Sequence, residues 1–379
     1  MSGTTDTLIS RDCDRILAVN GGSSSIKFAL FAAGDPPRGL HRGAVDRIDP
    51  NAVATDWLDA LALGGQLEGV VAVGYRVVHG GSKHFDPQPV TTELLADLRA
   101  AISFAPAHLP DAIRLIEAVD RRLPGVPQVA CFDTAFHRDL PPVARLLPIP
   151  RACADAGLRR YGFHGLSYAY LMEELARQAG PNTARGRVIL AHLGSGASMA
   201  AVRDGRCIDT TMGLTPAGGL VMGTRTGDLD PGVLIHLARN EGLSPDRLEE
   251  LVTRRSGLLG VSGTSSDMRD LLAAQAADPR AAEAVELFCY QIRKCVGAYA
   301  AALGGLDTLV FSGGIGENAP EVRGRVCDDL RFLGIELDPA ANSANAAVIS
   351  AGAVGVRVIP TDEEAMIART VLRSVGASP

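Results

Sequence analysis

One short segment near the N-terminus restricts the fold more than any other part of the chain: residues 19–28, which read VNGGSSSIKF. Apolar runs flank it at 16–19 and 28–31, a pattern that predicts strand, tight turn and strand. Glycines let the backbone approach a ligand closely, serines add hydroxyl groups, and Lys27 adds a positive charge, so the turn suits phosphate oxygens. It is not a Walker loop, because neither GxxxxGKS nor GxxxxGKT occurs in the chain, and it is not a dinucleotide fingerprint. The segment therefore predicts a phosphate-binding hairpin of another kind.

The composition of the 379 residues narrows the class of protein. The length suits two domains of about 100–200 residues each, and 46% apolar against 21% charged residues allows sizeable cores. A net charge of −6 argues against nucleic acid or an anionic membrane as partner. The seven cysteines form no CxxC pair, the N-terminus lacks the basic start of a signal peptide, and no apolar run reaches about 18 residues. We therefore expect a soluble cytoplasmic protein with reduced thiols.

The apolar runs alternate with helical patterns, which predicts an α/β fold. Helices are expected at 111–122, where Asp111 can act as the cap, at 281–303, which ends at a pair of glycines, and at 364–374. The expected strands are 16–19, 28–31, 70–78, 129–132, 188–193, 309–311 and 356–359.

A weak internal repeat accompanies this order. ILA at 16–18 is followed by Gly21 and Ser25, and ILA at 189–191 is followed by Gly194 and Ser198 at identical spacing. Each copy predicts a strand that enters a Gly/Ser turn, so we expect two similar halves with a ligand cleft between them. The Pro-rich stretch at 147–150 marks the expected boundary.

Four motifs carry a charged or titratable side chain in a position suited to a ligand. Arg76 in YRVVHGG ends one apolar strand, and Asp133 in FDTAFH follows another, where ligand groups gather in α/β sheets. His164 lies next to a glycine in RRYGFHG, and Arg225 is central in the polar loop MGTRTGDLDPG. Each has a structural alternative: a surface arginine, a helix cap, a structural histidine and an Arg–Asp salt bridge within the loop.

Two further motifs follow strands near the C-terminus. GGIGEN at 313–318 allows close approach of the backbone to a nucleotide. PTDEE at 360–364 supplies carboxylates that can hold Mg²⁺, although acids at a helix N-terminus also complement the helix dipole. Taken alone, each motif leaves its structural alternative open.

Together, these motifs resemble those of the acetokinase family, which comprises acetate kinase and its propionate and butyrate kinase relatives. The resemblance runs from about residue 16 to residue 369. It implies the fold of sugar kinases, actin and ATP-driven chaperones, with two duplicated α/β actin-like domains around a central nucleotide cleft. The implied domains are 1–147 with 365–379, on the acyl-acceptor side, and 148–364, with nucleotide and dimer contacts. The motifs that carry the resemblance, in chain order, are NGGSSSIKF, YRVVHGG, FDTAFH, RRYGFHG, MGTRTGDLDPG, SGLLGVSGTSSDMR and GGIGEN.

The resemblance also implies a reaction: reversible transfer of a phosphoryl group from ATP to a short-chain carboxylate, acetate as first choice, to give an acyl phosphate and ADP. A carboxylate is already ionised at neutral pH, so the enzyme must neutralise charge and align the reactants rather than supply a base. By resemblance, Arg76 binds the carboxylate, Arg225 binds the transferring phosphoryl group, and His164 donates to its equatorial oxygen. Asp133 is expected to orient an arginine or Mg²⁺.

The remaining site residues follow from the same resemblance. Asn20 and Glu363 match the family's magnesium ligands, with Mn²⁺ as an alternative ion, and Lys27 matches an ATP contact. The carboxylate pocket is matched, beside Arg76, by Val78, His108, Phe163 and Pro216. The other matched nucleotide contacts are His192, Leu193, Gly194, Ser195, Gly196, Asp267, Met268, Arg269, Gly313, Gly314, Ile315, Gly316 and Glu317.

The chain departs from the family pattern at a few positions. Ser195 replaces an Asn that would offer an amide donor to phosphate, and Ala107 replaces a Leu of the acyl-pocket wall. A smaller wall leaves room beside a methyl group, and a methylene is worth about 1–3 kcal/mol in such a pocket. We therefore expect propionate or a longer acid to be accepted better than in the family at large. Leu109, Tyr168 and Gly218 also differ, and the last two have no physical explanation in the sequence.

Three functions follow as alternatives: an acetate kinase, a kinase for propionate or another short acid with a widened pocket, and a non-catalytic ATP-regulated module of the actin or chaperone type. Paired arginines for an anionic acceptor argue against the third. The resemblance also implies a homodimer, and a C-terminal helix that packs on the first domain.

Overall fold

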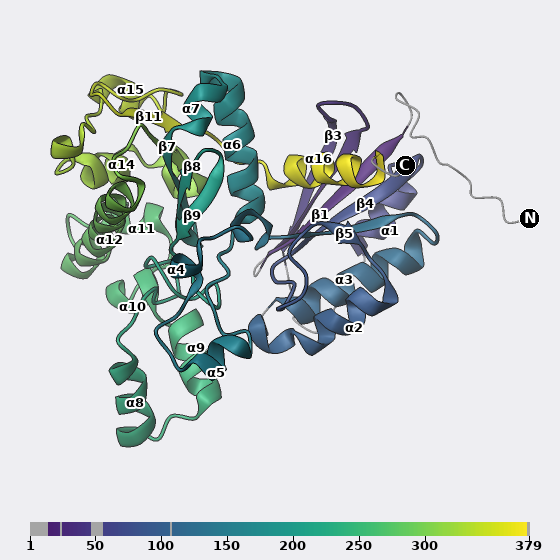
Figure 1. Cartoon of the computed structure of the whole chain (residues 1–379), viewed down its shortest axis with the longest axis horizontal. Helices are drawn as coiled ribbons and strands as arrows, with labels where there is room; N and C mark the ends of the chain where they lie inside the picture. The colour runs from purple at the N-terminus through teal and green to yellow at the C-terminus, as the bar shows by residue number, and fades with distance from the viewer. Residues whose placement is uncertain (1–13, 23–24, 47–55, 107, 377–379) are drawn as a thin grey trace, which may run out of the picture. The chain divides into compact units, whose positions relative to one another are not determined.

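The computed structural model describes residues 14–22, 25–46, 56–106 and 108–376. Ser23 and Ser24 of the N-terminal hairpin, and Ala107 of the expected acyl pocket, lie outside these residues. The chain separates into two compact units (Figure 1). The first contains residues 1–135, 165–170 and 362–379, and the second contains residues 136–164 and 171–361.

The first unit is built on a six-stranded sheet with the order β3-β2-β1-β4-β6-β5. Strands β1, β4 and β6 are parallel, β2 is antiparallel to β1, and β3 is antiparallel to β2. The strands are β1 (Arg15–Gly21), β2 (Ser25–Ala32), β3 (Arg38–Asp46), β4 (Val70–Val77), β5 (Gln88–Pro89) and β6 (Gln128–Phe132). The helices are α1 (Asp56–Leu63), α2 (Thr92–Ala100), η1 (Ile102–Phe104), α3 (Leu109–Arg122) and α16 (Glu363–Gly376).

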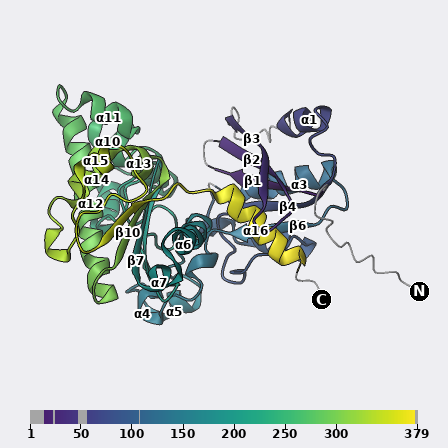
Figure 2. The ribbon, with the colours of Figure 1, turned by 90° about the horizontal axis from the view of Figure 1, so that it is seen from above.

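Helix α16 lies across one face of this sheet, as Figure 2 shows. Its apolar side packs on buried residues of β1, β2, β4 and β6 and forms a hydrophobic cluster with them. Gly74 on β4 makes this close packing possible, because a Cβ there would lie only 2.4 Å from Cγ2 of Ile367 and 2.5 Å from Cγ2 of Val371. The C-terminal segment thus packs on the first unit, as the resemblance implied.

The second unit is built on a five-stranded sheet with the order β11-β10-β7-β8-β9. Its strands are β7 (Arg187–Leu193), β8 (Ala197–Arg203), β9 (Arg206–Thr210), β10 (Thr308–Ser312) and β11 (Gly355–Val358). Helix α6 (Gly165–Ala179) begins with residues of the first unit. The other helices are η2 (Ala135–His137), α4 (Pro142–Arg145), α5 (Arg151–Asp155), α7 (Pro181–Arg185), α8 (Pro231–Asn240), α9 (Pro245–Arg254), α10 (Gly257–Ser262), α11 (Met268–Ala274), α12 (Pro279–Leu303), α13 (Gly313–Asn318), α14 (Pro320–Cys327), η3 (Arg331–Leu333) and α15 (Pro339–Ser343).

The two sheets share one topology. In the second unit β7, β10 and β11 are parallel, β8 is antiparallel to β7, and β9 is antiparallel to β8. The order β9-β8-β7-β10-β11 therefore repeats β3-β2-β1-β4-β6 with the same strand directions. The internal repeat in the sequence marks this duplication, since its two copies form the first hairpin of each sheet.

Several details differ from the expectations. Helix α3 begins at Leu109 with His108 as its N-terminal cap, so Asp111 lies inside the first turn rather than at the cap. The chain leaves the first unit at residue 135, earlier than the Pro-rich stretch at 147–150. Residues 136–164 belong to the second unit. Arg160 helps to attach this segment to β9 and the residue after it, because its Nη1 donates to the carbonyl oxygens of Thr210 and Thr211 at 2.9 and 3.0 Å.

The described part of the chain contains cysteines 131, 153, 207, 289, 295 and 327, all as free thiols. Within the same part, no helix has the length and apolar character needed to span a membrane.

Candidate functional site

Four of the predicted site residues meet at the ends of the parallel strands of the first unit. Asn20 is the penultimate residue of β1, Arg76 lies near the end of β4, and Asp133 follows β6 directly. The register pairs Val19 with Tyr75 and places Arg76 beside Cys131, so the three strand ends lie next to one another. Glu363 begins α16 and reaches the same place.

Arg76 and Asp133 form a buried ion pair. Nε of Arg76 donates to Oδ1 and Oδ2 of Asp133 at 3.0 and 2.9 Å, and Nη2 donates to Oδ2 at 2.5 Å. Nη1 donates to Oδ1 of Asn20 at 3.4 Å. A terminal guanidinium nitrogen carries two N–H groups, so each of the two has a further N–H to offer a ligand. The carboxylate holds one edge of the guanidinium group and leaves the other for an anion.

The charge of Arg76 is strongly favoured in this setting. Burial alone would lower the pKa of its guanidinium group, but the negative charges of Asp133 and Glu363 outweigh burial and raise the pKa above its ordinary value. The side chain of Arg76 is 14% exposed and that of Asp133 is fully buried. Arg76 therefore offers a permanent positive charge with a fixed direction.

The carboxylates of α16 converge on Asn20. Its amide nitrogen donates to Oε2 of Glu363 at 2.8 Å and to Oε1 of Glu364 at 2.7 Å. The structural alternative for the PTDEE motif, in which acids stabilise a helix N-terminus, also holds in part. Oδ1 of Asp362 accepts a hydrogen bond from the backbone N–H of Ala365 at 2.9 Å and caps α16.

The chemistry of this donor set suits a hard divalent cation, since Mg²⁺ prefers carboxylate and amide oxygens and is often held by only one or two protein carboxylates. In the described residues, no group of three or more His, Cys, Asp or Glu side chains is arranged as a metal cluster.

Two of the other predicted residues of the first unit, Lys27 and Val78, lie close in the chain or in register to these strand ends. Lys27 on β2 pairs in register with Asn20 and has an exposed side chain. Val78 is buried directly after β4, and His108 caps the start of α3.

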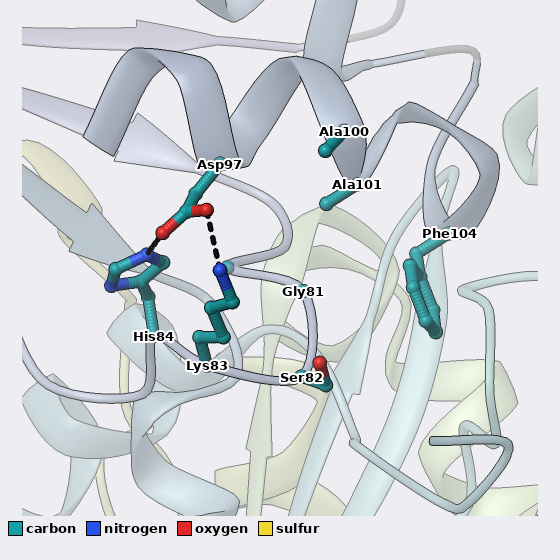
Figure 3. Close-up of a pocket in the computed structure, with 9 residues that line it drawn as sticks. Gly81, Ser82, Lys83, His84, Asp97, Ala100, Ala101 and Phe104 are labelled. Atoms are coloured by element: carbon teal, nitrogen blue, oxygen red, sulfur yellow. Dashed lines mark hydrogen bonds and ion pairs between the residues drawn. The ribbon is translucent and has the colours of Figure 1, made fainter. Parts of the chain in front are cut away.

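A pocket of about 100 Å³ opens beside the loop that follows β4 (Figure 3). Nζ of Lys83 donates to Oδ1 of Asp97 at 2.7 Å, and Nε2 of His84 lies 2.9 Å from Oδ2 of the same carboxylate. The bond from Lys83 lowers the pKa of Asp97. Because these charged groups pair with one another, we place the candidate site at the strand ends and not in this pocket.

The second unit gathers a separate group around the hairpin between β7 and β8. Gly196 lies in this turn, and a Cβ there would lie 2.8 Å from Nη2 of Arg225 and 3.3 Å from Nε2 of His164. The rings of His164 and His192 lie 4.4 Å apart between centroids. Because residue 196 has no side chain, the guanidinium group of Arg225 and the imidazole of His164 can lie directly against the backbone of the turn.

His164 is held in an unusual conformation. Its φ is 61°, in the left-handed region that non-glycine residues rarely adopt, and the residue is buried, with 8% of its surface exposed. Nδ1 lies 2.8 Å from Oγ of Ser198 on β8, which leaves Nε2 directed at Gly196.

Arg225 and Ser195 are positioned by backbone contacts. Nη1 of Arg225 donates to the carbonyl oxygen of Pro216 at 2.6 Å, which brings two predicted site residues together. The backbone N–H of Gly223 donates to the carbonyl oxygen of Ser195 at 3.0 Å and ties the arginine loop to the hairpin turn.

The GGIGEN motif forms the short helix α13, directly after β10. Gly313 has φ of 75°, and a Cβ there would lie 2.6 Å from the carbonyl oxygen of Leu193. Glu317 turns back to its own strand end: Oε1 accepts from the backbone N–H of Gly313 at 2.8 Å and of Thr361 at 3.2 Å. These bonds give Glu317 a structural task beside the nucleotide contact predicted for it.

Asp267 and Arg269 form a pair at the start of α11. Oδ1 of Asp267 accepts from the backbone N–H of Arg269 at 2.8 Å, and Nη2 of Arg269 donates to Oδ2 at 2.6 Å. These bonds lower the pKa of Asp267. Met268, between them, is buried, so its side chain belongs to the core.

Two residues of this arrangement, Ser198 and His137, escaped the sequence analysis as site residues, and a third, Glu364, was included only within a motif. Ser198 was noted only for the internal repeat, and its position on the strand after the turn was the available signal. Glu364 was one of the PTDEE carboxylates suited to Mg²⁺, although only Glu363 was assigned as a ligand. His137 was part of FDTAFH, yet nothing in the sequence pointed to its contact with the backbone of Phe163, 3.0 Å away.

Comparison with known proteins identifies the family. A sequence profile of the Acetokinase family matches residues 51–369. The chain is 46% identical to an acetate kinase from Rhodopseudomonas palustris (strain ATCC BAA-98 / CGA009), over 95% of this chain and 98% of the relative. The chain belongs to the acetokinase family.

Relatives named propionate kinase are nearly as similar to this chain. A propionate kinase from Citrobacter rodentium is 43% identical over 95% of this chain and 96% of its own length. The crystal structure of a propionate kinase from Francisella tularensis is 36% identical, with a TM-score of 0.88 over 95% of this chain and 100% of that one. The family and the duplicated actin-like fold expected from the motifs are thereby confirmed.

Proposed function

We propose that this protein transfers the γ-phosphoryl group of ATP to acetate, reversibly, to give acetyl phosphate and ADP. The observation that carries the proposal is the buried Arg76–Asp133 pair, which presents a fixed guanidinium edge at the ends of parallel strands in an acetokinase chain. A planar fork of N–H donors matches a carboxylate, and the positive charge offsets the repulsion between acetate and ATP.

We propose direct transfer between the two reactants. One carboxylate oxygen forms a bond to the γ-phosphorus while the bond from that phosphorus to the β,γ-bridging oxygen breaks, and ADP takes the electron pair. Arg76 binds the attacking carboxylate, and Asp133 orients Arg76. Arg225 and His164, which share the turn at Gly196, donate hydrogen bonds to the transferring phosphoryl oxygens.

Mg²⁺, held by Asn20 and Glu363 with Glu364 beside them, would neutralise charge on the ATP phosphates. The hairpin turn at 192–196 and the start of α13 are the proposed phosphate contacts, and Asp267 with Arg269 the contacts to the nucleoside. Ser195 offers a hydroxyl where the family has an amide.

We further propose that the enzyme acts as a homodimer in the cytoplasm, where ATP is supplied. Exposed apolar side chains on and around α8, Leu229, Val233 and Ile235, support contacts made by the second unit. Sedimentation at micromolar concentration tests this assignment.

The activity is tested by incubating the protein with ATP, Mg²⁺, hydroxylamine and a panel of C2–C5 acids, and measuring acyl hydroxamate. We expect hydroxamate with acetate, and none from Arg76→Ala under the same conditions. The panel includes propionate because Ala107 replaces a larger wall residue. Nucleotide binding without hydroxamate from any acid would contradict the proposal and favour a non-catalytic ATP-binding module.

A further inference from the structure

His137 contacts the backbone that carries the proposed phosphoryl-binding histidine. It ends η2 and is buried within the second unit. Its Nε2 lies 3.0 Å from the carbonyl oxygen of Phe163. That carbonyl and the N–H of His164 belong to the same peptide group, so His137 contacts the peptide plane that immediately precedes His164.

The protonation of His137 follows from its partners. A carbonyl oxygen only accepts, so Nε2 carries the proton and donates. Nδ1 lies 3.2 Å from Sγ of Cys207, which also lies 3.3 Å from the carbonyl oxygen of Asp209. Burial lowers the pKa of His137 to about 4, and the positive charge of Arg160 acts in the same direction. The hydrogen bond to Phe163 raises the pKa, but by less than burial lowers it. His137 is therefore neutral near pH 7, with its N–H directed at Phe163.

The backbone at this point needs such a restraint. His164 has φ of 61°, and Gly162, two residues earlier, has φ of 77°. A Cβ on Gly162 would lie 2.6 Å from the ring of His137, so ring and backbone are in close contact. Rotation of the peptide between Phe163 and His164 would change φ of His164 and turn its imidazole away from Gly196. A donor bound to the Phe163 carbonyl opposes that rotation.

We propose that His137 is a positioning residue for phosphoryl transfer: its Nε2–H holds the Phe163 carbonyl and thereby sets the direction of the His164 imidazole. The inference rests on the proposed function, in which His164 donates to the transferring group. His137 itself does not touch the reactants. Its loss should therefore lower kcat more than it changes the KM for ATP, because small displacements of an aligned group cost up to about 100-fold in rate.

Two substitutions test the contribution of the N–H donor of His137 separately from that of its ring. His137→Phe keeps a planar ring and removes the N–H, whereas His137→Gln replaces the ring and keeps an N–H donor near the position of Nε2. We expect His137→Phe to lower kcat by about 10- to 100-fold with the KM for ATP within about threefold, and His137→Gln to recover most of that loss. Cys207→Ala, which removes the contact at Nδ1 but not the donor, is the matched control and should keep kcat near the wild-type value.

Near-wild-type kcat in His137→Phe, or an equal loss in His137→Gln, would overturn the proposal. Thermal unfolding of each variant establishes that it is folded before its kcat is compared.

A spectroscopic measurement does not depend on catalysis. In substrate-free protein labelled with ¹⁵N-histidine, we expect a slowly exchanging Nε2–H signal that disappears in His137→Phe. The ring signals of His164 should shift in His137→Phe and stay in place in Cys207→Ala. Unshifted His164 signals in His137→Phe would overturn the positioning role. If the wild-type protein makes no acyl hydroxamate, the proposed function fails, while these signals still decide whether His137 positions the ring.

Discussion

Replacing Asp133 by Asn removes the negative charge from the buried pair with Arg76. The carboxylate is fully buried and accepts from Nε and Nη2 of Arg76 at 2.5 to 3.0 Å. An amide has a single acceptor oxygen, so at least one of these bonds is lost. A hydrogen bond to a charged group contributes about 1.5–3 kcal/mol, which corresponds to about a 10- to 150-fold change in a binding constant.

We expect this loss to appear in kcat/KM for acetate and mainly in the KM, because Arg76 is the proposed carboxylate ligand and Asp133 only orients it. The KM for ATP should change little. The hydroxamate assay, run with acetate and ATP varied in turn, measures both values. Equilibrium unfolding in urea should also show a loss of stability, since breaking a buried pair by altering one partner costs about 3–5 kcal/mol.

Asp97→Asn is the matched control, because it alters a more exposed pair, with Lys83 and His84 in the same unit, and should change both measurements little. A fall in kcat with an unchanged KM for acetate would refute the reasoning, since Asp133 would then act on the chemical step. Unchanged kcat/KM would show that the orientation of Arg76 does not depend on the pair.

Three further substitutions test other parts of the structure. Arg225→Ala should lower kcat by at least about 100-fold, as expected for an arginine on a transferring phosphoryl group; a near-normal rate in the hydroxamate assay would exclude that role. Gly196→Ala places a methyl group 2.8 Å from Nη2 of Arg225 and 3.3 Å from Nε2 of His164, so kcat should fall by about tenfold or more in a protein with unaltered thermal stability. Wild-type kcat would mean that the turn tolerates a side chain there. Gly74→Ala places a methyl group 2.4 Å from Cγ2 of Ile367 and should lower the free energy of unfolding by about 1–3 kcal/mol. An unchanged urea midpoint would contradict close packing of α16 on β4.

Most strands were predictable because their signal is local. Buried strands such as β7 and β10 are continuous apolar runs, and the structure extends the predicted ranges by only a residue or two. The start of α3 was predicted less well, because Asp111 satisfies the sequence rule for a cap while the tertiary structure ends the preceding loop at His108.

The sequence predicted which residues form the candidate site, but not which of their side chains contact one another. Asp133 could equally have capped a helix, and Arg76 could have been a surface side chain. Their contact depends on the parallel register of β4 and β6, which no local pattern encodes. The same holds for Ser198, which contacts His164 only because β8 folds back along β7.

The sequence by itself determined the α/β class, because strand periodicity and glycine-rich turns are properties of short segments. It also identified the family and its duplicated halves, through the resemblance of seven motifs and a weak internal repeat. The tertiary structure alone decided which side chains became partners. Asn20 contacts Glu363 across 343 positions of the chain, and His137 contacts the carbonyl that precedes His164. A hydrogen bond requires atoms within about 3 Å of each other, and for residues far apart in the chain that distance is set by how strands and helices pack.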